Sequence, residues 1–187
     1  RNTVSFPAAL GVWLAAMLAG KETVFLNWTV GEANLRHCLR ISGVKHILSS
    51  GLLLDRLDRP GLHLSALPVE WVRLEELGAS LGLFEKLRGA RKARFIRSFR
   101  KCEVAETAAI LFTSGSESVP KGVPLSHLNL LTNASDAIRV LGLTPDEKIV
   151  AMLPPFHSFG LIADLVLPLA FGLKAAFHPN PTESAKV

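Results

Sequence analysis

The chain has 187 residues, of which 49% are hydrophobic and 20% charged, and its formal net charge is +5. This apolar content excludes intrinsic disorder and collagen-like repeats, and the length suits one domain or part of a larger one. The two cysteines are too few for a disulfide framework and have no second thiol or histidine at zinc spacing, which favours a reducing compartment.

The longest apolar stretch covers residues 6–20 and is shorter than the roughly 20 residues that span a bilayer. It also lacks the preceding basic region and the following small-residue cleavage site of a signal peptide. Because the chain begins at Arg1 and stops at Val187 soon after an expected strand, we expect residues 1–187 to be an incomplete piece of a longer protein.

Short apolar runs alternate with helical patterns along the whole chain. The expected strands are residues 23–26, 46–48, 108–112, 123–125, 149–153 and 174–177. The expected helices are about 6–18, 32–41, 52–57, 74–87, 126–140 and 159–171. This alternation predicts an α/β fold with a largely parallel sheet flanked by helices on both faces.

The net positive charge of the chain comes from a basic amphipathic segment, residues 83–101. Eight basic side chains and no acidic one occur from Lys86 to Lys101, and the rest of the chain carries a net charge of −3. Leucine and phenylalanine recur there at the spacing of one helix face. The segment is therefore a solvated helix packed on the domain, a helix resting on an anionic membrane surface, or a nucleic-acid contact, although no base-reading element accompanies it.

Residues 113–122 carry the most specific chemistry in the sequence. Four hydroxyl side chains, two glycines and one lysine follow an expected buried strand, and open α/β sheets bind ligands at such strand ends. Glycine and hydroxyl donors, with the ammonium of Lys121, suit the β- and γ-phosphates of a nucleotide. The stretch is not a Walker A loop, because Pro120 precedes the lysine and Gly122 follows it. The alternative is a Ser/Gly turn between two strands that binds nothing.

The order Thr-Ser-Gly-Ser-Glu-Ser-Val-Pro-Lys-Gly resembles the phosphate-loop signature of the adenylate-forming (AMP-binding) superfamily, which includes acyl-CoA synthetases. A second stretch, residues 153–161 with the order Leu-Pro-Pro-Phe-His-Ser-Phe-Gly-Leu, is similar to the aromatic-histidine motif that lines the acyl pocket in this family. Ser116 followed by Glu117 resembles the subgroup of acyl-acyl-carrier-protein synthetases and their fusions with 2-acylglycerophosphoethanolamine acyltransferase. Ser118 departs from that subgroup, in which glycine is expected.

The resemblance implies that residues 1–187 belong to the large N-terminal domain of an ATP- and Mg²⁺-dependent fatty acid ligase. Such an enzyme forms an acyl-adenylate and passes the acyl group to the thiol of an acyl carrier protein or CoA, which in the fused subgroup serves lysophospholipid reacylation. The nucleotide contacts that it implies are Thr113, which is also the implied metal ligand, Ser114, Gly115, Ser116, Glu117, Ser118, Lys121 and Gly122. The implied substrate contacts are Phe156, His157 and Gly160.

The family's adenine-contacting segment, ribose-binding aspartate and catalytic lysine do not occur in the sequence. We therefore expect no catalytic residue in this chain and no adenylation activity from the chain alone. Two other classes of protein stay open: a non-enzymatic peripheral membrane module built on residues 83–101, and an unrelated nucleotide-binding domain. We expect a cytoplasmic protein with peripheral contact to the inner face of the cell membrane, and no nucleic-acid partner.

The histidines outside the aromatic-histidine motif give weaker signals. His127 follows an expected strand, and its position at a helix start favours a structural role over nucleotide contact. The other histidines form no constellation along the sequence; they are His37, His46, His63 and His178.

Overall fold

The computed structural model describes residues 6–58, 63–113 and 119–178. The strands are β1 (His46–Ser49), β2 (Glu70–Arg73), β3 (Thr107–Phe112), β4 (Gly122–Ser126), β5 (Lys148–Ala151) and β6 (Lys174–Phe177). The α-helices are α1 (Phe6–Leu18), α2 (Glu32–Ser42), α3 (Gly51–Leu57), α4 (Leu74–Ser80), α5 (Leu83–Ala93), α6 (His127–Leu141), α7 (Ser158–Gly160) and α8 (Leu167–Phe171). The shorter turns are η1 (Trp28–Val30), η2 (Leu64–Ala66), η3 (Ile96–Lys101) and the π-helical η4 (Leu161–Val166). The predicted α/β class is confirmed.

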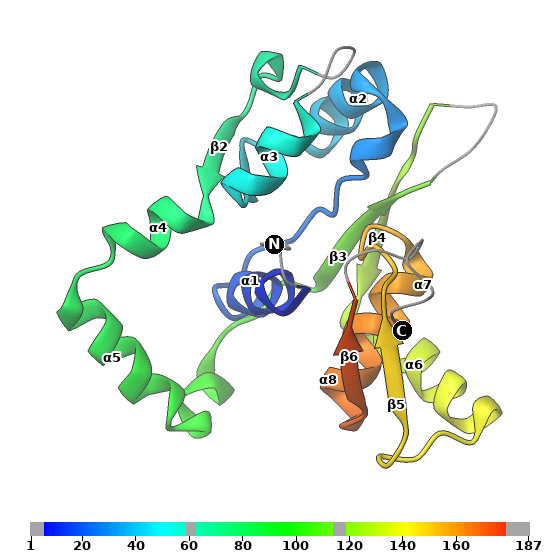
Figure 1. Ribbon diagram of the computed structural model, residues 1–187. Helices are drawn as coiled ribbons and strands as arrows, with labels where there is room; N and C mark the ends of the chain where they lie inside the picture. Colours follow the sequence, from blue (N-terminus) through cyan, green and yellow to red (C-terminus); the bar gives the residue numbers. More distant parts are fainter. Residues whose placement is uncertain (1–5, 59–62, 114–118, 179–187) are drawn as a thin grey trace.

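The described strands pair as three two-stranded sheets. β1 pairs with β2 and β5 pairs with β6 in parallel, whereas β3 and β4 form an antiparallel hairpin. In Figure 1, β3, β5 and β6 all run upward, so their carboxyl ends point to the same side of the molecule. This is the arrangement that collects ligand-binding segments at the carboxyl ends of strands.

The main hydrophobic core lies between α1, the hairpin and the helices α6 to α8. Its fully buried side chains include Trp13, Ala109, Leu161 and Leu165. The indole Nε1 of Trp13 donates a hydrogen bond to the carbonyl oxygen of Ala108 at 3.0 Å. Ala108 lies at a register shift of the hairpin, so the indole satisfies a carbonyl that the regular ladder does not pair. Helix α1 is thereby fixed to β3.

A second core forms around α2. Its buried side chains are Leu35, Leu39, Leu54, Leu64 and Leu67. Helix α2 ends at Gly43, whose φ of 66° is the left-handed conformation that terminates helices at glycine. The two cores are joined by the chain between α1 and α2.

The prediction of a strand at residues 23–26 is wrong. The chain makes a single parallel bridge between Val24 and Ile110, with two backbone hydrogen bonds, one on either side of the bridge. Asn27 then caps η1 by accepting the amide of Thr29, which turns the chain away from β3. The contact is too short to make a strand.

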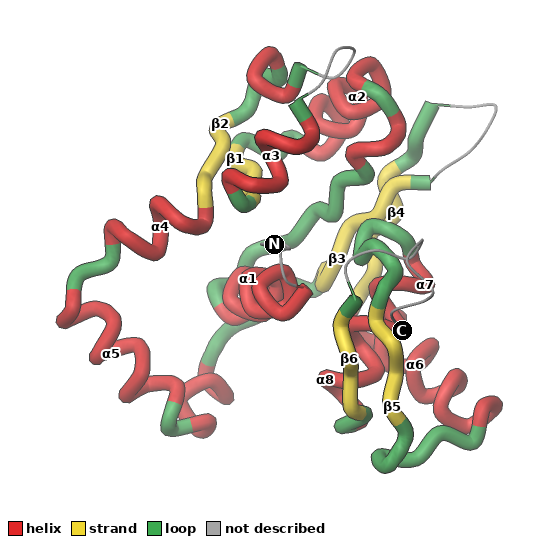
Figure 2. The backbone as a smooth tube through the Cα atoms, viewed as in Figure 1, coloured by secondary structure: helices red, strands yellow, loops and turns green. Residues whose placement is uncertain are grey.

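The prediction of one helix over residues 74–87 is also wrong. The backbone is extended at Leu81 and Gly82, and the Glu85 carboxylate accepts the amide of Gly82, so a new helix begins there. Strand β2 was not expected, because its four residues place only Trp71 and Val72 between two charged side chains. Figure 2 shows α4 and α5 as two separate helices that lead away from the sheets.

The expected helix at residues 159–171 is present as α7, η4 and α8 in sequence. Pro168 lacks the N–H that would bond to the carbonyl of Asp164, and the wider π turn before it accommodates the proline ring.

Asp164 lies in this turn and is only 2% exposed. Its carboxylate accepts the amide of Leu153 at 2.6 Å and also that of Met152. Burial nevertheless raises the pKa of Asp164 above its ordinary value of 3.8, because desolvation of the carboxylate outweighs these two bonds.

This pKa shift predicts a specific pH dependence of stability. Because the folded state holds the Asp164 proton more tightly than the unfolded state, the group's contribution to the free energy of unfolding falls as pH rises from 3.8 through the raised pKa. Urea unfolding of the wild type and of Asp164→Asn at several pH values should show the wild type losing stability relative to the variant over this interval. The matched control is Asp136→Asn, whose exposed carboxylate pairs with Arg139. If the difference in the free energy of unfolding between the wild type and Asp164→Asn did not change with pH, the raised pKa of Asp164 would be contradicted.

Candidate functional site

The base of the predicted phosphate loop is closed by two hydrogen bonds. The amide of Thr113 donates to the carbonyl of Lys121 at 3.0 Å, and the amide of Lys121 donates to Thr113 Oγ1 at 3.0 Å. Both side chains are exposed. A hydroxyl and an ammonium therefore lie on facing strands at the point where the hairpin opens into the loop. The predicted contacts Ser114, Gly115, Ser116, Glu117 and Ser118 lie outside the described residues.

Gly122 begins β4 and pairs with Phe112 across the hairpin. A Cβ at this position would lie 3.4 Å from the Phe112 ring, so the glycine allows the ring to lie close to the backbone. The described contacts of Gly122 are those of a strand residue just below the loop.

The second strand of the loop is held by α2. The ring Nε2 of His37 lies 3.1 Å from the carbonyl oxygen of Pro120, which is buried. On the other side of the ring, Arg40 Nη2 lies 3.2 Å from His37 Nδ1. Because a guanidinium only donates, Nδ1 accepts, and the proton is on Nε2 facing Pro120. His37 thus anchors the loop through a contact that its sequence position did not reveal.

The aromatic-histidine motif follows β5 and begins the α7 helix. Phe156 is only 4% exposed and packs edge-to-face on Trp28, with ring centroids 4.5 Å apart. The imidazole of His157 also lies near Phe156, with ring centroids 4.7 Å apart, and His157 is exposed. Phe156 therefore forms a buried wall, and the motif presents His157 to the outside.

Gly160 allows the tight approach of α7 to the chain before it. A Cβ there would lie inside van der Waals contact of the Pro154 carbonyl oxygen and 3.0 Å from that of Leu153. The same Leu153 donates its amide to Asp164. The turn from β5 into α7 is thus fixed at both ends, and the described role of Gly160 is close packing against the backbone of Leu153 and Pro154.

One segment of the chain touches both predicted motifs. Trp28 in η1 packs on Phe156, and His37 in α2 bonds to Pro120. These two residues were missed from the sequence because their partners lie far along the chain, 83 residues away for His37. The bridge from Val24 to Ile110 places this segment beside β3, directly below the loop.

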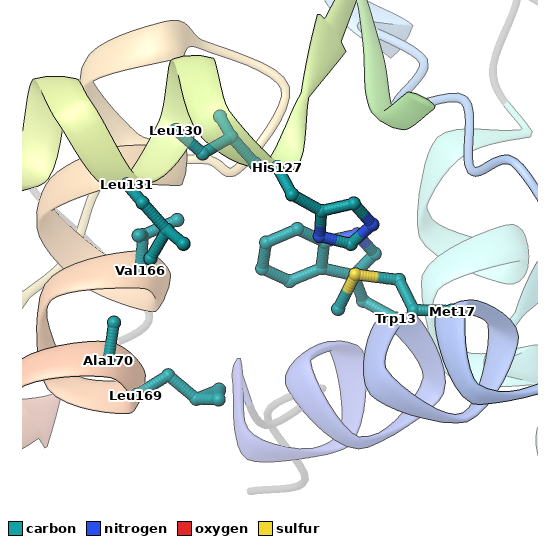
Figure 3. A pocket seen from close by; sticks show the side chains of 8 residues that line it. All are labelled: Trp13, Met17, His127, Leu130, Leu131, Val166, Leu169 and Ala170. Carbon is teal, nitrogen blue, oxygen red and sulfur yellow. The ribbon is translucent and has the colours of Figure 1, made fainter. Parts of the chain in front are cut away.

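A cavity of about 130 Å³ lies elsewhere, between α1, α6 and α8 (Figure 3). Its lining residues are Trp13, Met17, His127, Leu130, Leu131, Val166, Leu169 and Ala170. His127 follows Ser126, which pairs with the first residue of β3, so the cavity is at the opposite end of the hairpin from the loop. The ring of His127 lies 3.2 Å from the carbonyl of Ala105, which supports its structural interpretation. Ligand pockets are typically larger than about 300 Å³, so we do not assign a substrate to this cavity.

Within residues 6–58, 63–113 and 119–178, no group of three or more His, Cys, Asp or Glu side chains is arranged to hold a metal ion. The exposed hydroxyl of Thr113 at the base of the loop is an oxygen of the kind that Mg²⁺ takes as a ligand, and Mg²⁺ commonly combines few protein ligands with waters and substrate phosphates. None of the described helices combines the length and apolar character needed to cross a membrane.

Residues 3–187 match the model of the AMP-binding enzyme family, and the chain belongs to this family. It is similar to medium-chain-fatty-acid–[acyl-carrier-protein] ligase JamA of Moorena producens, with 41% identity over 41% of this chain and 14% of that protein. It is also similar to long-chain-fatty-acid–CoA ligase 1 of Schizosaccharomyces pombe, with 30% identity over 69% of this chain and 21% of that protein.

Among solved structures, the chain resembles o-succinylbenzoate coenzyme A synthetase of Bacillus subtilis in complex with ATP and magnesium ion. The TM-score is 0.71 with 20% identity, over 97% of this chain and 44% of that one. The fold is therefore that of the N-terminal domain of adenylate-forming enzymes. The chain spans only 14% and 21% of the two curated relatives named above.

The His37 anchor predicts a local effect on the loop. In His37→Ala the buried Pro120 carbonyl loses its donor, at a cost of about 1–2 kcal/mol, and amide hydrogen exchange at Thr113 and Lys121 should accelerate about five- to thirtyfold. His37→Gln supplies an N–H donor and should restore most of the protection. His46→Ala, which removes an exposed histidine of β1, is the control. Unchanged exchange in His37→Ala would show that the loop base does not depend on α2.

The close packing at Gly160 predicts that a larger residue at this position lowers the stability of the fold. Gly160→Ala should lower the free energy of unfolding by about 2 kcal/mol or more, because the added methyl group meets backbone carbonyls that have little room to move. Gly11→Ala in α1 is the matched control, since a Cβ there meets nothing within 4 Å and should stabilise by about 0.5–1 kcal/mol. Urea unfolding measures both. Equal stability of Gly160→Ala and the wild type would argue against the close packing.

Proposed function

We propose that this chain is the N-terminal part of an AMP-forming ligase that activates a fatty acid and transfers it to a thiol. A carboxylate oxygen of the fatty acid attacks the α-phosphorus of ATP, the bond from that phosphorus to the β-phosphate oxygen breaks, and pyrophosphate leaves. The acceptor thiol then gives up its proton and attacks the acyl carbon of the adenylate, and AMP leaves. The similarity to fatty acid ligases of Moorena producens and Schizosaccharomyces pombe supports this reaction class.

The observation that carries the proposal is the facing pair at the base of the loop. Thr113 and Lys121 are held together by two hydrogen bonds and both side chains are exposed. The hydroxyl can donate to a phosphate oxygen, and the ammonium can offset the negative charge that moves onto pyrophosphate as the bond breaks. Such preorganised electrostatic contacts are the main source of catalysis in phosphate chemistry. Bound Mg²⁺ supplies further charge neutralisation at the phosphates, with Thr113 as its proposed protein ligand.

The aromatic-histidine motif is proposed to receive the carboxyl end of the fatty acid. Phe156 is backed by Trp28 and gives a rigid apolar wall, while His157 is exposed beside it and has hydrogen-bonding nitrogens for a carboxylate. Gly160 allows the turn that carries both side chains to pack tightly on Pro154. Residues 114–118 complete the phosphate loop in this proposal.

The acceptor thiol is proposed to be that of an acyl carrier protein. The order Ser116-Glu117 and the similarity to the carrier-protein ligase of Moorena producens support this choice. The similarity to the CoA ligase of Schizosaccharomyces pombe supports CoA as the alternative acceptor. Lysophospholipid reacylation rests only on the resemblance of this dipeptide to the fused subgroup. No acyltransferase is among the relatives named above.

The test uses ATP–pyrophosphate exchange in the complete protein encoded with this chain, assayed with saturated fatty acids of increasing length. Lys121→Ala should lower the exchange rate about a hundredfold or more, as the loss of one charge-stabilising contact does in other active sites. Lys148→Ala removes an exposed lysine at the amino end of β5 and should leave the rate unchanged. The isolated 187-residue chain should give no exchange.

Two results would count against the proposal. Wild-type exchange in Lys121→Ala would remove the lysine from its phosphate-binding role. Fatty-acid-dependent exchange by the isolated chain would show that the family segments not found in its sequence are not needed for adenylation. Circular dichroism of each variant separates a loss of activity from a loss of fold.

A further inference from the structure

Helix α5 exposes large apolar side chains that the rest of the described chain does not cover. All of its residues are exposed, and Leu83, Phe84 and Leu87 are 75%, 77% and 61% exposed. In Figure 1, α5 lies apart from the sheets, at the end of the path that β2 and α4 form. A cluster of this kind on the surface of a folded protein marks an interaction site more often than chance exposure does.

The helix geometry combines this cluster with positive charge. At about 100° per residue, Leu83, Phe84 and Leu87 fall within one sector about 100° wide. Lys86 lies just beyond one edge of this sector and Arg88 just beyond the other. Arg91 follows Leu87 by one turn and lies within the same sector, at its C-terminal end, and all three basic side chains are exposed. We call these six residues the apolar-basic face: Leu83, Phe84, Lys86, Leu87, Arg88 and Arg91.

The net positive charge of the chain is confined to the segment that contains this face. Eight basic residues and no acidic residue lie from Lys86 to Lys101, whereas the rest of the chain has a net charge of −3. The segment therefore has a local positive potential that selects an anionic partner. Charge complementarity alone fits a nucleic acid as well as a lipid surface.

The apolar side chains favour the lipid. A nucleic-acid backbone would pair with the basic residues and leave Leu83, Phe84 and Leu87 in water. At a bilayer surface, these three side chains enter the acyl-chain boundary, while the long stems of the flanking Lys and Arg side chains reach back to the phosphates. We propose that the apolar-basic face of α5 binds the surface of an anionic lipid bilayer. The proposal does not depend on ligase activity.

The test is sedimentation of the 187-residue chain with vesicles of phosphatidylcholine alone and with vesicles containing equal parts of phosphatidylcholine and phosphatidylglycerol. Binding is expected only to the anionic vesicles and should weaken as salt is raised. Each basic side chain contributes about fivefold to affinity, so Lys86→Gln, Arg88→Gln and Arg91→Gln combined should weaken binding about a hundredfold. The control combines Lys21→Gln, Lys45→Gln and Lys148→Gln. It makes the same change in net charge at exposed sites outside α5.

A second variant tests the apolar contribution. Phe84→Ser combined with Leu87→Ser should reduce binding at least tenfold, because two large side chains no longer enter the bilayer. Circular dichroism checks that the variants fold. We expect them to fold because the replaced side chains are largely exposed. Three outcomes would overturn the proposal: equal loss in both charge variants, tighter binding to a single-stranded oligonucleotide than to vesicles, or self-association through α5 without vesicle binding.

Discussion

The segment from η1 to α2 holds both candidate motifs, and the arrangement of the site depends on this double contact. Trp28 fixes the aromatic wall through Phe156, and His37 fixes the second strand of the phosphate loop through Pro120. The hydrogen bond to a proline carbonyl is informative because Pro120 has no N–H of its own to bond across the hairpin. Its carbonyl is therefore the group through which a neighbouring helix can hold the strand. Without this segment, a loop and a strand end would have no common support.

Much of the fold was predictable because its signals are local. The helices expected at about residues 32–41 and 126–140 are present as α2 and α6. Gly43 ends α2 in the left-handed conformation, and the hydroxyl of Ser126 caps the start of α6. The β-branched and apolar run before Thr113 likewise predicted β3. Each of these features depends on residues within one or two turns of each other. Features of such short range can be recognised directly from the order of residues in the sequence.

The features that were not predicted depend on contacts between distant residues. Strand β2 exists because β1 offers it a partner, and residues 23–26 fail to form a strand because η1 turns the chain away. At the site, the motif order indicated Lys121 and His157, but the roles of Trp28 and His37 depend on tertiary packing. A tryptophan and a histidine near a helix start have many equivalent interpretations until their partners are known.

The irregularity at Ala108 has a consequence at the far end of the hairpin. The indole of Trp13 pins the displaced carbonyl, and this fixes which residues of β3 and β4 face each other along the whole ladder up to Phe112 and Gly122. If the strands slipped by one position, Thr113 would meet Pro120, which has no amide hydrogen for the threonine oxygen. A tryptophan in the first helix thus protects the alignment of a hydroxyl and an ammonium that it never touches.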